Sequence, residues 1–282
     1  MSRESERAPG TQWADVSPRD LRAFDTDVAP SARVHDYWLG GKDNYTADRA
    51  AGDAVIEAYP GIVMSVRANR AFLARVVRFL AAEAGIRQFL DIGTGIPAAN
   101  NTHEVAQAAA PDCRVVYVDY DPVVLAHARA LLTSSPQGVT DYIDADLRDP
   151  QKILEQAKRT LDFSRPVAVM LIAIMHLVVD QDGPQEIVDR LMAAVPAGSY
   201  LALSQVASDI EAEQMAEAAR RYNRLAHETQ RHRTHAEVER FFDGLDLVEP
   251  GLVAVQNWRP ASEFEAASPS AMWGGVGSKP AQ

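Results

Sequence analysis

The sequence has a single cysteine and no long hydrophobic run. Cys113 stands alone among 282 residues, so no disulfide can form within the chain, which favours a reducing compartment. No apolar stretch reaches the roughly eighteen residues that a membrane-spanning helix requires. The first ten residues are polar and lack the apolar segment of a secretory signal. We therefore predict a cytoplasmic protein that has no membrane segment.

An excess of positive charge is absent as well. The chain has 28 basic and 39 acidic residues, which gives a formal net charge of −11. Surfaces that bind nucleic acids are normally basic, so we expect no nucleic-acid partner. The histidines show no spacing typical of a metal site, and we predict no bound metal. No pattern in the sequence indicates an oligomeric state.

Composition and periodicity divide the chain into four parts. Residues 1–30 hold several prolines among charged residues, which predicts a flexible arm. Residues 31–85 have helical patterning and predict an N-terminal helical extension. Residues 86–260 alternate between strand and helix patterns and predict the main ligand-binding domain. Residues 261–282 are rich in Ser, Ala, Gly and Pro, which predicts a loose tail.

The alternating pattern indicates a doubly wound α/β fold. Short apolar strands are expected at 88–92, 114–118, 139–143, 166–175 and 199–205, each followed by a helical stretch. Two further strands, 247–249 and 252–256, are separated by Pro250-Gly251, which predicts an antiparallel pair at the sheet edge. The expected fold is therefore a mostly parallel, seven-stranded sheet with an antiparallel edge and helices on both faces.

The turn after the first predicted strand carries the clearest motif. It reads Asp91-Ile92-Gly93-Thr94-Gly95. In doubly wound sheets the ligand lies beyond the carboxyl ends of the strands, and glycines let the backbone turn sharply and approach it. We therefore predict that Asp91, Gly93, Thr94 and Gly95 contact a cofactor.

The same turn separates two cofactor classes. Dinucleotide-binding enzymes use a third glycine and bring a pyrophosphate to the following helix, whereas this chain has Pro97 and Ala98 in that region. Asp91 would place a negative charge close to a pyrophosphate, but it suits the ammonium group of S-adenosylmethionine. The turn thus favours S-adenosylmethionine over NAD.

Acidic residues also end the second and third predicted strands. Asp119 is placed to accept hydrogen bonds from ribose hydroxyls, with Tyr120 along the nucleoside. After the third strand, Asp146 is expected to hold the adenine amino group and the backbone of Leu147 to reach a ring nitrogen. Asp144 is the competing acid at this position.

The fourth predicted strand delivers Ala173 and His176 to the mouth of the same site. Methyl transfer is an in-line displacement in which alignment does most of the work, and a base helps when the acceptor must lose a proton. His176 is the candidate for that base. A histidine that only shapes the pocket is an equally good interpretation.

Several segments resemble a known family. They are RVHDYWLGGKDNY at 33–45, NRAFL at 69–73, HEVAQ at 103–107, DPVVLAHAR at 121–129, FFDGL at 241–245 and WRP at 258–260. Over about residues 15–260 the chain resembles actinobacterial S-adenosylmethionine-dependent methyltransferases that were first catalogued as a domain of unknown function. The resemblance implies the class I methyltransferase fold and S-adenosylmethionine as cofactor, and it implies no particular acceptor.

The first of these segments allows two interpretations. Its Gly-Gly turn and clustered polar and aromatic residues could form a lid over the cofactor, or a structural corner packed on the core. Tyr37 in this segment and Asn69 in the next are candidate cofactor contacts. Arg33, Arg67 and Arg70 are candidate partners of the methionine carboxylate.

The leading hypothesis is therefore S-adenosylmethionine-dependent methyl transfer to a small-molecule acceptor. A non-catalytic S-adenosylmethionine-binding protein would carry the same cofactor motifs. An NAD(P)-dependent oxidoreductase is the third alternative, disfavoured by Asp91 and the missing third glycine.

Overall fold

The computed structural model describes residues 25–131 and 134–281. Most of the predicted arm, residues 1–24, lies outside the described residues. The last residues of that arm are packed rather than loose: Ala29 is buried and forms a β-bridge with Ala226.

The core of the molecule is one mixed β-sheet. Its parallel part consists of β1 (Gln88–Ile92), β2 (Arg114–Asp119), β3 (Val139–Asp144), β4 (Ala168–Ile172) and β5 (Tyr200–Val206). The strand order is β3-β2-β1-β4-β5-β8-β6, where β8 (Met272–Ser278) and β6 (Asp246–Leu247) are antiparallel strands from the end of the chain. The predicted doubly wound α/β fold is confirmed, and the five parallel strands lie close to their predicted positions.

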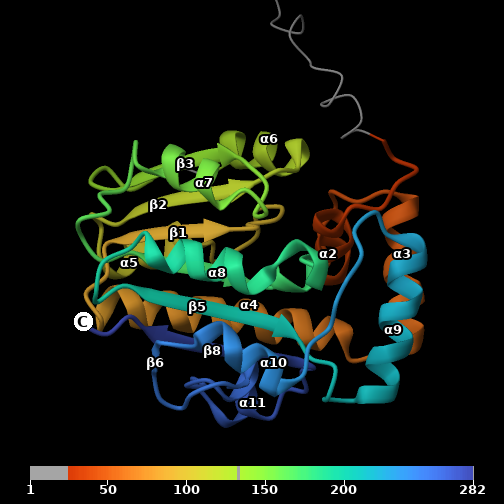
Figure 1. Cartoon of the computed structure of the whole chain (residues 1–282). Helices are drawn as coiled ribbons and strands as arrows, with labels where there is room; N and C mark the ends of the chain where they lie inside the picture. The colour runs from red at the N-terminus through yellow and green to blue at the C-terminus, as the bar shows by residue number, and fades with distance from the viewer. Residues whose placement is uncertain (1–24, 132–133, 282) are drawn as a thin grey trace, which may run out of the picture.

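Helices cover both faces of this sheet (Figure 1). One face packs against α4 (Ile62–Ala82) and α5 (Thr102–Ala109), and the other against α7 (Pro150–Ala157) and α8 (Pro184–Ala193). The connection between β2 and β3 contains α6 (Pro122–Leu131). The side chains of β1 alternate between the two cores, since Leu90 and Ile92 join the α7–α8 side and Phe89 the α4–α5 side. Asp91 therefore shares the face of Phe89 and points toward α4 and α5.

The carboxyl-terminal part of the sheet differs from the prediction. The segment expected to be a loose tail forms α11 (Glu263–Ala266) and the antiparallel strand β8 (Met272–Ser278), which pairs with β5 along its whole length. The short strands β6 (Asp246–Leu247) and β7 (Val253–Ala254) both pair with β8 and not with each other. The predicted hairpin was therefore wrong, and the sheet has eight strands instead of seven.

Close packing explains why the sequence of β8 resembles a loose segment. A Cβ atom on Gly274 would lie 2.7 Å from Val255 and 2.9 Å from the ring of Phe72. A Cβ on Gly277 would lie 2.9 Å from Phe242. Glycine in this strand is required by neighbouring side chains, so a composition typical of loops here belongs to an inner strand.

A helical cap lies beyond the carboxyl ends of the parallel strands (Figure 1). It consists of α2 (Ser31–Leu39), α3 (Thr46–Ala58) and α9 (Ala212–Leu225), and its apolar residues form a third core with the start of α4. Shorter elements complete the chain: α10 (His235–Glu239), η1 (Met175–Leu177), η2 (Asp180–Asp182), η3 (Arg240–Phe242) and η4 (Val255–Asn257). The predicted helical extension is thus present as the cap and α4.

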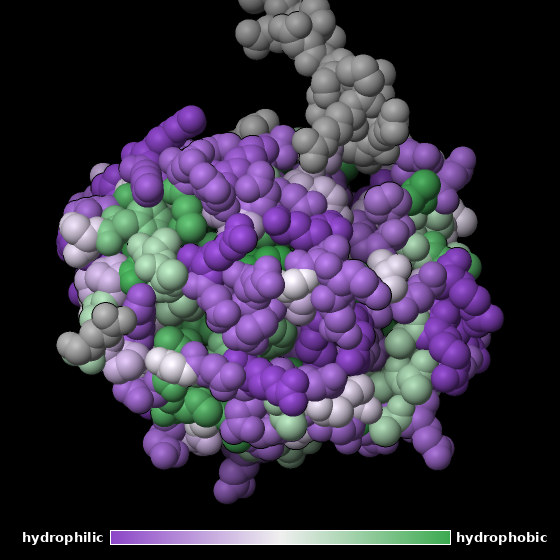
Figure 2. Space-filling model, viewed as in Figure 1, coloured by the Kyte–Doolittle hydropathy of each residue, from purple (hydrophilic) through white to green (hydrophobic). Residues whose placement is uncertain are grey.

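The outer face seen in Figure 2 is mainly hydrophilic, with apolar residues in separate patches. None of the helices within the described ranges combines the length and the apolar character that crossing a membrane takes.

Candidate active site

A cavity opens beside the end of β1, where the order of the strands in the sheet reverses. β1 lies between β2 and β4, so the chain leaves β1 toward one side of the sheet and later returns to its other side at β4. Ligands of open α/β sheets bind at this switch point. The lining includes the following residues predicted from the sequence: Asn69, Asp91, Gly93, Thr94, Gly95, Asp119, Tyr120, Asp146, Leu147, Ala173 and His176.

The glycine turn after β1 has the conformation that its sequence suggested. Gly93 and Gly95 have φ values of +77° and +65°, which residues with a side chain rarely adopt. A Cβ atom on Gly93 would lie 2.5 Å from Ile174, in the turn after β4. A Cβ on Gly95 would meet no atom within 4 Å and would project into open space beside the cavity. Glycine at 95 therefore leaves room for a ligand against the backbone.

Asp91 is a buried carboxylate at the end of β1. Its Oδ2 accepts a hydrogen bond of 2.5 Å from Oγ1 of Thr102, the first residue of α5. Burial raises the pKa of Asp91 to about 6, although the hydrogen bond from Thr102 and the charge of Arg70 act in the opposite direction. A cation bound beside this carboxylate would relieve the cost of burying it.

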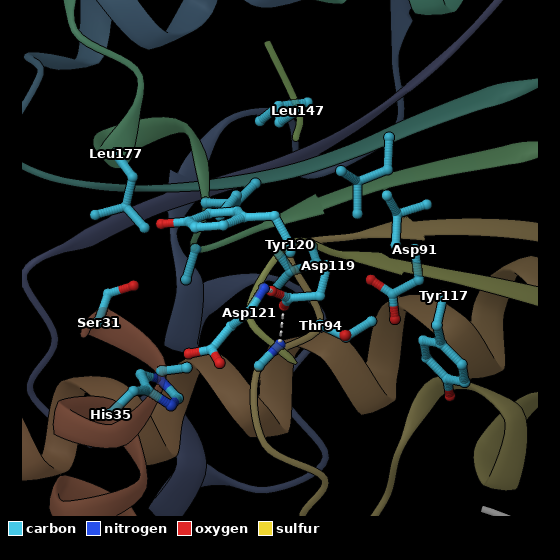
Figure 3. Close-up of a pocket in the computed structure, with 18 of the residues that line it drawn as sticks. Ser31, His35, Asp91, Thr94, Tyr117, Asp119, Tyr120, Asp121, Leu147 and Leu177 are labelled. Atoms are coloured by element: carbon cyan, nitrogen blue, oxygen red, sulfur yellow. Dashed lines mark hydrogen bonds between the residues drawn. The ribbon is translucent and has the colours of Figure 1, made fainter. Parts of the chain in front are cut away.

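Asp119 holds the two loops of the site together (Figure 3). Its Oδ2 accepts from the backbone N–H of Gly95 at 3.0 Å, and its Oδ1 accepts from that of Asp121 at 3.0 Å. Burial raises the pKa of this carboxyl as well, to about 6. The carboxylate keeps further lone pairs that can accept from a ligand hydroxyl.

The structure separates the two acids near the end of β3. Asp144 is exposed and does not line the cavity, whereas Asp146 and Leu147 do. One oxygen of Asp146, Oδ1, accepts from the backbone N–H and from Nε of Arg148, both at 2.9 Å. The preferred candidate, Asp146, therefore lies at the cavity, and its other oxygen, Oδ2, can accept a hydrogen bond from a ligand.

A glutamate that the sequence analysis did not select ties the cap to this site. Oε1 of Glu228 accepts from the hydroxyl of Tyr120 at 2.6 Å, and its Oε2 accepts from the backbone N–H of Ser31 at 2.8 Å. Figure 3 shows the ring of Tyr120 extending over the cavity toward Leu177, with Ser31 on the side of α2. No local pattern predicts this contact, because Glu228 follows α9 and lies far from Tyr120 in sequence.

His176 lies in η1 with its side chain buried against the cavity. Burial lowers its pKa to about 3, and the neighbouring His232, His35 and Arg233 lower it further. The imidazole is therefore neutral at physiological pH. Its Nδ1 has no hydrogen-bond partner among the described residues.

Tyr37, a candidate cofactor contact, does not line the cavity. Its hydroxyl donates to Asp53 at 2.6 Å on the outer side of the cap. Its side chain points away from the cavity, because residues of one helix point to different sides.

The three candidate arginines also lie in different surroundings. Arg33 forms a fully buried ion pair with Asp48 at 3.0 Å, and Arg67 is exposed. Arg70 alone among them lines the cavity, where it donates to the backbone oxygen of Ala99 at 2.8 Å.

The Gly-Gly segment is fixed in place by several polar contacts. Oδ2 of Asp36 accepts from the backbone of Asp43 and from the side chain of Asn44. Together with the buried Arg33–Asp48 pair, these bonds join α2 to α3. The segment is built as a packed wall, and its cavity-facing residues are His35 and Trp38, one turn of helix apart.

These residues fit S-adenosylmethionine. The cavity has a carboxylate at the end of β1, a second at the end of β2 and an open cradle at Gly95. Oδ1 of Asn69 is buried and has no partner among the described residues, so it is available to a ligand donor.

Two solved structures are similar to this chain over nearly its whole length. A DUF574-family protein of Streptomyces avermitilis is 48% identical, covers 91% of this chain and 99% of its own, and superposes with a TM-score of 0.87. A proposed methyltransferase of Thermobifida fusca is 40% identical, covers 96% of this chain and 100% of its own, and has a TM-score of 0.84. No curated protein matches the chain.

The family comparison covers nearly the whole sequence, since residues 18–280 match the S-adenosyl methyltransferase family. This excludes the alternative of an NAD(P)-dependent oxidoreductase. The chain belongs to the S-adenosyl methyltransferase family, and it is a methyltransferase that uses S-adenosylmethionine.

Proposed function

We propose that this enzyme transfers the methyl group to a small molecule that binds inside the cap. The observation that carries this proposal is the roof over the cavity, where α2 and the Tyr120–Glu228–Ser31 contacts cover the cofactor site. A site covered in this way admits a small acceptor more readily than a nucleic acid or a protein side chain. The acidic balance of the chain, with a net charge of −11, also disfavours nucleic acid.

The cavity residues suggest one orientation for the cofactor. Asp91 would hold the ammonium group and Arg70 the carboxylate of the methionine part. Asp119 would accept from the ribose hydroxyls, and Asp146 with the backbone of Leu147 would hold the adenine. Each polar group of the ligand then has a partner of matching charge or hydrogen-bonding character.

When it is bound, S-adenosylmethionine supplies an electrophilic methyl group on a sulfonium. The protein's part is to align the acceptor with that group and to exclude water. His176 lies where the turn after β4 meets the cap, so it can contact the acceptor. As a neutral imidazole it can accept a hydrogen bond from an acceptor hydroxyl or amine and receive the proton that the methyl group replaces.

The product S-adenosylhomocysteine provides a direct test. At one hundred times its dissociation constant a ligand stabilises the folded state by about 2.7 kcal/mol. For a chain of this length that corresponds to a rise in Tm of roughly 5 to 10 °C. Asp119→Ala should abolish most of the rise, while the matched variant Asp144→Ala, at an exposed acid outside the cavity, should keep it.

Differential scanning fluorimetry of the three proteins measures both effects. If S-adenosylhomocysteine leaves the Tm of the natural sequence unchanged, the proposed cofactor site is wrong. If both variants respond as the natural sequence does, Asp119 has no role in binding.

A further inference from the structure

A second, inner chamber continues from the cofactor cavity into the helical cap. The two share a wall made by His35, Trp38, Ala173, His176 and Gln230. Beyond this wall the chamber extends between α3, the start of α4 and α9, toward the ends of β5 and β8. A molecule in the chamber would therefore lie directly beside a ligand in the cofactor cavity.

The backbone at the shared wall is strained. Ala173 has a φ of +53°, in the left-handed region that alanine rarely adopts. Its N–H lies 2.9 Å from Oγ and 3.1 Å from the backbone oxygen of Ser204, which hold this conformation at the end of β4. Strain of this kind persists where the surrounding structure enforces it, and it is concentrated at functional sites.

The lining of the chamber is free of ionic groups. Among the described residues that line it, none is an aspartate, glutamate, lysine or arginine. The cofactor cavity, in contrast, is lined by Asp91, Asp119, Asp146 and Arg70, among other charged residues. An ionic group placed in the chamber would lose its hydration without gaining an opposite charge, which costs several kcal/mol or more.

The polar groups that the chamber does contain are neutral. His35, His176 and His232 all have a lowered pKa, chiefly because they are buried. Nε2 of His232 lies 3.0 Å from Oε1 of Gln230, so these two polar groups are hydrogen-bonded to each other. The Nδ1 atom of His176 is buried without a partner among the described residues, so this imidazole has a nitrogen to offer a ligand.

The size and walls of the chamber limit its occupant further. Its volume is about 40 Å³, and a bound water needs about 10 to 15 Å³ of such space, so the chamber has room for about three waters and admits only one small end of a molecule that reaches in from the cofactor cavity. The rings of Trp38 and Tyr59 both face it, and aromatic walls favour a flat ligand.

We propose that the inner chamber is the acceptor site and that it takes the uncharged, single-ring end of a small aromatic or heteroaromatic molecule. The acceptor's hydroxyl or N–H donates a hydrogen bond to the imidazole of His176. This bond orients the acceptor so that a lone pair of its heteroatom points toward the cofactor cavity. The acceptor heteroatom gains the methyl group, the carbon–sulfur bond breaks with its electron pair left on sulfur, and the acceptor proton passes by way of His176 to solvent, so that the imidazole returns to its neutral form. This inference rests on the proposed function, because it requires the cofactor in the neighbouring cavity.

The test measures binding of probes to protein saturated with S-adenosylhomocysteine. The probes are phenol, and the equally shaped pair 4-hydroxybenzamide and 4-hydroxybenzoate, which differ in charge at pH 7.5. Calorimetry or ligand-observed NMR should show binding of phenol, and at least tenfold weaker binding of the benzoate than of the benzamide. Absence of phenol binding, or equal affinities for the charged and neutral probes, would overturn the proposal.

A matched pair of variants places the probe in the chamber. Ala218 is buried on α9 and lines the chamber, while Ala216 is exposed on the same helix. Ala218→Leu should weaken phenol binding at least tenfold and leave S-adenosylhomocysteine binding intact, whereas Ala216→Leu should change neither. If Ala218→Leu fails to fold, Val66→Met fills the chamber from α4 with a more adaptable side chain.

The two hypotheses fail in different ways. If S-adenosylhomocysteine does not bind, the proposed cofactor site is wrong. If it binds and phenol does not, or if phenol binds Ala218→Leu or Val66→Met as well as the natural sequence, only the acceptor chamber is wrong.

Discussion

The cofactor cavity and the inner chamber share one wall but are lined by different kinds of side chain. The cavity lies on strand ends and presents acidic side chains, including Asp91 and Asp119, whose burial costs energy until a ligand arrives. The chamber lies among the helices of the cap and presents no ionic side chain in the described part of the chain. Ionic side chains thus line the cavity that suits a cationic, hydroxyl-bearing cofactor. Among the described residues, none lines the space proposed for the acceptor.

The comparison also separates two kinds of stability. The strand ends are held by the parallel sheet and its two large cores. The cap has a smaller core of its own and depends on the buried ion pair between Arg33 and Asp48. Changes in the cap should therefore alter folding, while changes at the strand ends should alter chiefly cofactor binding.

The largest effect is expected from breaking the ion pair of the cap. Arg33→Met leaves Asp48 buried without its partner, which typically costs about 3 to 5 kcal/mol. Chemical denaturation should show this loss in the free energy of unfolding. The control Arg49→Met removes an exposed arginine of the same region and should cost less than about 1 kcal/mol. Equal losses in the two variants would show that burial of the pair does not stabilise the cap.

Acidification should act on the two regions with opposite signs. The folded pKa values of His35, His176 and His232, about 3 to 4, lie below the ordinary histidine value of 6.5, so their contribution to stability is lost as the pH falls below 6.5. Asp91 and Asp119 have folded pKa values of about 6, above 3.8, so they take up protons and favour the folded state in the same range. Three histidines outweigh two carboxyls, and stability should fall between pH 7 and pH 5.

One substitution isolates the contribution of the chamber to this fall. His176→Phe should reduce the loss of stability between pH 7 and pH 5 by about 2 kcal/mol, because one histidine no longer takes up a proton on unfolding. Denaturation at the two pH values measures it. An unchanged fall in His176→Phe would contradict a buried, neutral imidazole.

The smallest effect is expected at the contact between the strand ends and the roof over the cofactor cavity. Tyr120→Phe removes the hydrogen bond to Glu228 that helps to hold the roof over the cofactor. The affinity for S-adenosylhomocysteine should fall about threefold to tenfold by calorimetry, which corresponds to a net contribution of about 1 kcal/mol from this hydrogen bond. The control Tyr37→Phe loses a bond of the same type and length, to Asp53, outside the cavity. Equal changes in affinity would show that the roof does not favour binding.

Much of the cofactor site could be predicted because its signals are local. A parallel strand buried on both faces is a short apolar run, and the residues that follow it lie at the same edge of the sheet as those of its neighbours. Asp91, Gly95, Asp119 and Asp146 were found in this way, and all of them line the cavity. Tyr37 was not predictable by the same argument, because a residue on a helix needs a known packing direction before its side chain can be placed.

Most residues of the inner chamber had no such signal. His35, His232 and Gln230 come from segments far apart in the chain and meet only because the cap folds over the strand ends. Strand β8 was missed for a different reason, since its glycines are required by neighbours such as Phe72 and Phe242 that are distant in sequence. Composition alone makes such a strand look like a tail.

The sequence by itself determined the class of the protein: the α/β fold, the glycine turn, and the acids after β1, β2 and β3 that suit S-adenosylmethionine. These features depend on the periodicity of a buried strand and on the residue types at its end, which neighbouring positions in the chain define. Only the tertiary structure decided which side chains turn inward from the cap, how β8 completes the sheet, and that an inner chamber lined by no ionic residue in the described ranges adjoins the cofactor cavity. Those features depend on the packing of segments that are far apart in the chain, such as Ser65 against Ala271, which are 206 residues apart, and packing of that kind leaves no local pattern.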